Sequence, residues 1–228
     1  AHYPPLSLRD ASDGKRGIIV DIAIEVFDRI DQSVEILFLP WKRALKYVQT
    51  GRVHAMLPLF FTTERSKTLE FVYPPLFHLE IVLFARRGID NNFDGTVNSI
   101  RGKNVVFFSG TSQNDDFDRA RTDGRINSQL VHSIEQQLKM VASGRADFAL
   151  AERNSGIHVT RNLGLESALL DLPAVVVSKP VYIAFNKSGR NQKTIDKLSK
   201  ELTAMTIDGA MAKIAAQYGW VKDTAPTK

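Results

Sequence analysis

One phrase occurs twice in this chain, and it constrains the fold more than any other feature. The copies read LKYVQTGRVHAMLP from Leu45 to Pro58 and LKMVASGRADFALA from Leu138 to Ala151. In each copy a helical stretch ends at a glycine, Gly51 or Gly144, because glycine readily reaches the left-handed conformation that helix ends often need. A short apolar stretch, typical of a strand, follows directly. The repeat therefore predicts two similar α/β halves, and we expect the ends of the two equivalent strands to face one another across a cleft.

Length and composition are those of an ordinary globular chain with room for two modest cores. The chain has 228 residues, of which 43% are hydrophobic and 24% are charged. No stretch approaches the roughly 18 consecutive apolar residues of a membrane-spanning helix. Because the sequence starts abruptly at AHYPPL, we expect a mature chain from which a targeting segment has been removed.

Cysteine usage and charge exclude several classes of function. The chain has no cysteine, which excludes disulfides, cysteine-ligated zinc, iron–sulfur clusters and thiol nucleophiles without indicating a compartment. Its formal net charge is +5, but the lysines and arginines are scattered among acids and form no basic block. This pattern argues against nucleic-acid binding.

Hydrophobic periodicity predicts the elements of the first half. Apolar residues recur at four-residue spacing from Ile18 to Ile30 and predict an amphipathic helix over 17–30. A second helical stripe comprises Trp41, Leu45 and Val48. We expect strands over 34–39, 53–57 and 80–85.

A second unit begins near residue 86 and repeats this order. Ser133 and Gln136 have the spacing of a capping box, which places the start of the second repeat's helix. Strands are expected over 103–108, 129–132 and 147–151, with extended segments over 174–177 and 181–185. There the chain should return to the first unit and finish with two helices. The predicted division is 1–85 with 182–228 for the first lobe, and 86–181 for the second.

Five segments, in the same order along the chain, resemble the extracytoplasmic solute-binding proteins of family 3, the amino-acid receptors of ABC importers. The segments read YPPLSLRDASDGKRGIIVDIAIEVFDRI, GRVHAMLPLFFTTERSKTLEFVYPP, FFSGTSQ, GRADFALAE and VYIAFNKSGRNQKTIDKLSKEL. No single segment is specific, whereas the ordered set is. The resemblance covers nearly the whole chain.

This resemblance implies an α/β Venus-flytrap fold, the type II periplasmic binding protein, in which two lobes are joined by two crossing strands. Such a receptor closes on a small solute, here an amino acid or a related carboxylate, and delivers it to a membrane permease. It further implies a periplasmic, monomeric protein without cofactor or metal and without catalytic activity.

The resemblance also assigns ligand-binding roles. Arg65, the last residue of TTER, matches the arginine that clamps the ligand's carboxylate, and a guanidinium suits a carboxylate bidentately. Gly110, Thr111 and Ser112 match the turn of the second lobe whose hydroxyl and N–H donors share the ligand. Simple N-capping of the next helix would explain the same Thr and Ser equally well.

Two further positions match the family pattern. Glu152 falls on the acid that receives the ligand's ammonium group, where relatives usually carry aspartate; the extra methylene moves the carboxylate roughly 1.5 Å outward. A solvated glutamate at a strand end is the alternative. Tyr3 matches an aromatic residue that stacks on the ligand, although a tyrosine before Pro-Pro is also compatible with simple packing.

The chain departs from the family pattern just before Arg65. Where many receptors carry Ser or Thr, this chain has Leu57, Pro58 and Phe60, and proline has no N–H to donate. A standard α-amino-acid pose is therefore in doubt. Trp41 is compatible with an aromatic wall of the site, but its spacing favours core packing, and Phe60 is compatible with either.

Two other classes of function remain alternatives. Some proteins with this fold are dehydratases, but the chain has no nucleophile elbow, no HExxH zinc motif and no phosphate-binding loop, and its histidines lack metal-ligand spacing. Glu152 could still act as a general acid or base in a dry cleft. A ligand-sensing domain of a receptor or kinase is the other alternative.

Overall fold

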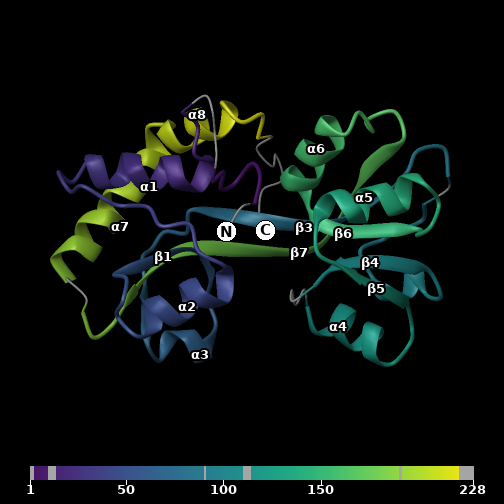
Figure 1. The fold of residues 1–228 in the computed structure, drawn as a ribbon, viewed down its shortest axis with the longest axis horizontal. Helices are drawn as coiled ribbons and strands as arrows, with labels where there is room; N and C mark the ends of the chain where they lie inside the picture. The colour runs from purple at the N-terminus through teal and green to yellow at the C-terminus, as the bar shows by residue number, and fades with distance from the viewer. Residues whose placement is uncertain (1–2, 10–13, 90, 110–113, 190–191, 221–228) are drawn as a thin grey trace. The chain divides into compact units, whose positions relative to one another are not determined.

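The computed structural model describes residues 3–9, 14–89, 91–109, 114–189 and 192–220. The chain divides into two compact α/β units, Ala1–His78 with Pro180–Lys228 and Leu79–Lys179, here called unit 1 and unit 2. It passes between them twice, inside β3 (Phe77–Arg86) and inside β7 (Leu169–Asn186) (Figure 1). This is the predicted two-lobed fold with two connecting strands. The expected lobe limits at residues 85 and 181 stay a prediction.

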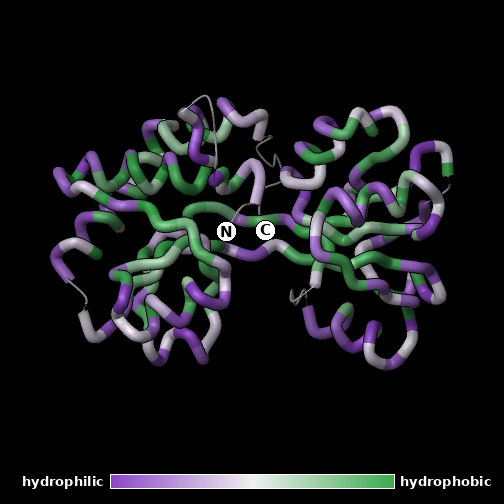
Figure 2. The backbone as a smooth tube through the Cα atoms, viewed as in Figure 1, coloured by the Kyte–Doolittle hydropathy of each residue, from purple (hydrophilic) through white to green (hydrophobic). Residues whose placement is uncertain are grey.

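Unit 1 pairs two short strands with the second half of β7. Both β1 (Ala55–Phe60) and β2 (Leu69–Phe71) run antiparallel to it. The apolar stripe of α1 (Ile18–Asp28) is buried, and α1 contacts both α7 (Gln192–Ile207) and α8 (Ala210–Ala216), the two predicted C-terminal helices (Figure 1). The alternation of purple and green along the helices in Figure 2 follows this one-sided burial. The unit also contains α2 (Trp41–Gln49) and α3 (Thr63–Ser66).

One expected strand of unit 1 is wrong. Residues 34–39 form no strand within the part of the chain that the structure describes. None of their side chains is buried, and Leu37 is 55% exposed. The β-branched and aromatic composition of this stretch therefore favoured an extended backbone but did not secure a ladder partner.

The sheet of unit 2 contains β3, the first part of β7 and three further strands, and helices cover both of its faces. Its central β4 (Asn104–Phe108) runs parallel to β5 (Asn127–Val131) and β6 (Phe148–Glu152), and β6 pairs antiparallel with β3. In Figure 1, α4 (Asp115–Thr122) lies on one face, and α5 (Ile134–Ala142) with α6 (Arg153–Asn162) lies on the other. A short 3₁₀ helix, η1 (Val97–Ile100), contacts α4.

The two copies of the repeated phrase adopt the same local structure. Each is a helix, a glycine with positive φ (71° at Gly51 and 77° at Gly144) and a strand, as α2 with β1 and as α5 with β6. Each helix end is also held by a side chain from the end of a connecting strand. Asn186 donates to the carbonyl of Val48 at 2.7 Å, and Arg86 donates to that of Val141 at 3.2 Å. The repeat is therefore present in the structure as well as in the sequence.

No helix among the described residues has both the length and the apolar composition needed to cross a membrane.

Candidate functional site

Arg65 lies in α3, shortly after the end of β1, and three contacts hold it there. Thr62 caps the short helix α3, and its hydroxyl accepts the N–H of Arg65 at 3.2 Å. The guanidinium folds back so that Nη1 donates to the carbonyl of Phe60 at 2.8 Å. Its Cζ also lies 5.2 Å from the centre of the Trp41 ring, within cation–π range. The end of β1, the start of α3 and the ring of Trp41 together hold the guanidinium in one position.

The charge of Arg65 has no acidic partner in the part of the chain that the structure describes. Its contacts are a neutral carbonyl and a neutral ring, although the residue is half-buried. Burial lowers the pKa of Arg65 for that reason. A guanidinium held in place without a counter-ion keeps donors for a planar anion such as a carboxylate.

Trp41 corrects the expectation of core packing. Val48 on the same helix is fully buried and Leu45 packs against the core, as the spacing predicts. Trp41 is instead 44% exposed, because it is the first residue of α2 and lies beyond the edge of the core. The guanidinium of Arg65 lies over the Trp41 ring.

The other predicted residues of unit 1 lie on or near the surface. Leu57, Pro58 and Phe60 are half-exposed residues of β1, and Phe60 pairs with Val181 of β7. Tyr3 is half-buried, and its N–H donates to the carbonyl of Ser7 at 2.8 Å. The contact between Phe60 and Arg65 joins the strand to the predicted clamp.

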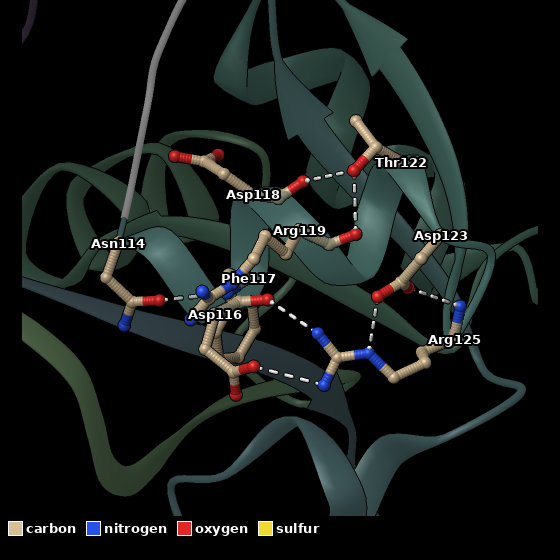
Figure 3. A network of polar contacts seen from close by, with 8 residues as sticks. All are labelled: Asn114, Asp116, Phe117, Asp118, Arg119, Thr122, Asp123 and Arg125. Carbon is tan, nitrogen blue, oxygen red and sulfur yellow. Dashed lines mark hydrogen bonds and ion pairs between the residues drawn. The ribbon is translucent and has the colours of Figure 1, made fainter.

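In unit 2 the predicted turn falls outside the described residues, as do its members Gly110, Thr111 and Ser112. The helix that follows is capped elsewhere: Oδ1 of Asn114 accepts the N–H of Phe117 at 2.9 Å (Figure 3). Asn114 is therefore the N-cap residue of α4, and the roles of Thr111 and Ser112 stay a prediction.

Three further contacts fix the start and the end of α4. The Nδ2 of Asn114 donates to the carbonyl of Val176 on β7 at 3.1 Å. Past the end of the helix, Arg125 pairs with Asp116 at 3.0 Å and with Asp123 at 2.9 Å (Figure 3).

Glu152 ends β6 and caps α6. Its Oε1 accepts the N–H of Asn154 at 3.1 Å, and its Oε2 accepts the N–H of Ser155 at 2.7 Å. The residue is only 2% exposed, so the alternative of a solvated strand-end glutamate is wrong. Burial raises the pKa of Glu152, although the N–H donors oppose this. Whether it also contacts a ligand stays a prediction.

The helix that Glu152 caps was not predicted from the sequence. Glutamate is not a preferred N-cap residue, and Gly156 in the second turn weakens a helical pattern. The glycine is required because a side chain there would overlap with the ring of Phe84 on β3. The close approach of α6 to β3 thus explains a residue that the local pattern disfavours.

Arg153, the first residue of α6, holds a network of ion pairs that sequence reasoning missed. Its Nε pairs with Glu80 of β3 at 3.0 Å, and its Nη1 pairs with Asp171 of β7. Its Nη2 also donates to the carbonyl of Pro173 at 3.2 Å. The side chain is 15% exposed and joins the start of α6 to both connecting strands. Its partners are far away in sequence, so no local signal could have identified them.

No group of three or more His, Cys, Asp or Glu side chains suited to a metal ion occurs among the described residues.

Comparison with known proteins identifies relatives along almost the entire chain. The family model described as "Bacterial extracellular solute-binding proteins, family 3" matches residues 1–221. "Probable amino-acid-binding protein YxeM" of Bacillus subtilis (strain 168) is 25% identical over 203 residues, which cover 89% of this chain and 75% of that protein. "Putative amino-acid ABC transporter-binding protein PatH" of Vibrio harveyi is 25% identical over 210 residues, covering 90% and 81%.

Solved structures share the fold. A crystal structure of a histidine kinase sensor domain with similarity to periplasmic binding proteins superposes with a TM-score of 0.75 at 20% identity, covering 95% of this chain and 91% of that one. At this identity the likeness concerns the fold, which serves both receptors and sensors.

Proposed function

The chain belongs to family 3 of the bacterial extracellular solute-binding proteins, and we propose on that premise that it binds a small carboxylate-bearing solute, an amino acid or a related acid. The solute would bind between the two lobes and leave chemically unchanged. Both curated relatives are described as amino-acid-binding or transporter-binding proteins, which supports this class of ligand.

One observation carries the carboxylate part of the proposal. Arg65 is a half-buried cation that the described chain leaves without an acidic partner, while Phe60 and Trp41 hold it in one position. A ligand carboxylate would supply the missing counter-charge in a bidentate geometry. Because the cation is already placed, little conformational entropy is lost when the anion binds.

The surroundings of Arg65 supply contacts for the rest of the ligand. Half-exposed Pro58 and Phe60 would form an apolar floor, and Trp41 an aromatic wall. Tyr3 would stack on the ligand from the same unit, as the family pattern implies. From unit 2, the turn at 110–112 would add hydroxyl and N–H donors.

Delivery to a membrane permease follows from the same premise. PatH is described as a putative amino-acid ABC transporter-binding protein, and the family is described as extracellular, which supports this role. We propose on this support that the chain works in the periplasm as the receptor of an ABC importer.

The test begins with a thermal-shift screen of the standard L-amino acids, their 2-oxo acids and dicarboxylates, since a ligand that binds the native state raises the melting temperature. Hits are then titrated by calorimetry against wild type and Arg65→Ala. Loss of a buried charge pair costs about 2–5 kcal/mol, so we expect the affinity to fall by roughly 30-fold or more.

Arg52→Ala is the matched control. Arg52 also lies over an aromatic ring, Tyr47, at 5.3 Å in the same unit, but it is exposed. We expect this variant to bind like wild type. Unchanged affinity in Arg65→Ala, with a melting temperature near wild type, would refute the clamp.

A further inference from the structure

We propose that the solute is a carboxylic acid without an α-ammonium group, such as a 2-oxo or 2-hydroxy acid, because the acids at the start of α6 are already engaged within unit 2. This inference rests on the proposed function, in which Arg65 receives the carboxylate. It concerns the group on the α-carbon of the ligand. Glu152 is the residue at issue, because the family resemblance assigns to it the binding of an α-ammonium group.

Glu152 is committed to its own helix. Each of its carboxylate oxygens accepts a backbone N–H, from Asn154 at 3.1 Å and from Ser155 at 2.7 Å. Only 2% of the residue is exposed, so a ligand ammonium could reach it only if the packing around it opened. Drawing the carboxylate toward a ligand would also leave two N–H groups at a buried helix start without acceptors, which is costly.

Two other acids, Glu80 and Asp171, both form ion pairs with the guanidinium of Arg153, the residue that follows Glu152. The guanidinium is fixed further by the carbonyl of Pro173 at 3.2 Å. Glu80 and the Arg153 side chain are each 15% exposed. Turning either acid toward a ligand would leave part of a buried cation unpaired, so neither is a ready acceptor for an ammonium.

Burial raises the pKa of Glu152 although its two N–H donors favour the charged form, so desolvation opposes the anion that an ammonium would require. An ammonium placed there would lose its hydration, whereas an uncharged keto or hydroxyl group costs less to desolvate. In unit 1, the side chains of Leu57 and Pro58 just before Arg65 are apolar and offer no polar partner to an ammonium.

The experiment compares acids that differ only at the α-carbon. Wild-type protein is titrated by calorimetry with 2-oxoglutarate and L-glutamate, with phenylpyruvate and L-phenylalanine, and with 4-methyl-2-oxopentanoate and L-leucine. We expect at least one 2-oxo acid to bind about 10-fold more tightly than its amino partner, equivalent to about 1.4 kcal/mol. Arg65→Ala should remove that binding.

Glu152→Gln supplies a second measurement on the same pairs. It keeps one acceptor oxygen for the helix start, and we expect it to change the dissociation constant of the 2-oxo acid by less than about 2-fold. The inference is overturned if an amino acid binds more tightly than its 2-oxo partner, and decisively so if Glu152→Gln abolishes that preference.

The outcomes separate the two proposals. An amino acid that binds through Arg65 would sustain the proposed function and overturn this inference alone. If no member of any pair binds wild type, or if binding survives Arg65→Ala, the carboxylate clamp fails and this inference fails with it.

Discussion

The contacts of Arg153 predict a large loss of stability from one substitution, Arg153→Met. Methionine keeps most of the length of the side chain but removes the charge and all its donors. Glu80 and Asp171 then face each other without the shared cation, and the Pro173 carbonyl loses its donor. Two like charges in a largely buried place repel each other and cannot be solvated fully.

The magnitude follows from burial. Removing one partner of a fully buried pair costs about 3–5 kcal/mol. Arg153 and Glu80 are each 15% exposed and Asp171 is 29% exposed, so partial screening reduces the expected loss to about 2–3 kcal/mol. For a chain of this size each kcal/mol shifts the melting temperature by about 2–4 °C, which gives a decrease of about 4–12 °C.

Differential scanning calorimetry at about pH 7 and roughly 0.15 M salt measures this decrease. Lys67→Met is the control, because Lys67 and Glu64 pair at 2.7 Å but are 66% and 80% exposed. Such surface pairs contribute about 0–1 kcal/mol, so the control should differ little from wild type. Glu80→Gln added to Arg153→Met should restore part of the loss by removing one uncompensated charge.

The reasoning is refuted if Arg153→Met lowers the melting temperature no more than Lys67→Met does. A double variant with Glu80→Gln that is less stable than Arg153→Met alone would likewise show that repulsion between the two acids is not the cause.

Two further substitutions test the packing of α6. Burial raises the pKa of Glu152, so the native protein keeps the carboxyl proton to a higher pH than the unfolded chain does. The stability that this proton contributes is complete below the ordinary pKa of glutamate. It is lost as the pH rises through the raised pKa of the native state. Melting temperatures in buffers from about pH 4 to 8 should therefore fall in wild type relative to Glu152→Gln, and parallel curves would contradict this. Gly156→Ala places a methyl group against the Phe84 ring and should cost about 1–3 kcal/mol in urea unfolding, whereas Gly189→Ala, which meets no atom, should be near neutral; equal effects would contradict the predicted overlap.

Much of the fold was predictable because its signals are local. The helix at Ile18 and the capping of α5 by Ser133 depend on residues within a turn or two, and both predictions are confirmed. The stretch at 34–39 shows the limit of such signals. Its composition favours an extended backbone, but a strand also needs a partner and a buried face, which only the rest of the molecule can supply.

In the candidate site, too, some features could be predicted from the sequence and others required the structure. Arg65 was recognisable from the order of motifs, whereas its stacking on Trp41 required the structure, because the helical spacing of that tryptophan pointed to the core. Likewise Glu152 was singled out by position, but its capping of an unpredicted helix was not. Trp41 reaches Arg65 from another helix, whereas the partners of Glu152 are its sequence neighbours Asn154 and Ser155, in a helix that the local pattern disfavoured.

The sequence by itself therefore determined the architecture and the family. Its repeated helix–glycine–strand phrase fixes two α/β units, since hydrophobic period and glycine conformation act over a few neighbouring residues. Only the tertiary structure decided which charges are free. Arg65 lacks an acidic partner among the described residues, while the side chains of Glu152 and Arg153 are engaged, Arg153 by acids on two distant strands. Whether a charge is paired depends on distances between segments far apart in the chain, and folding alone sets those distances.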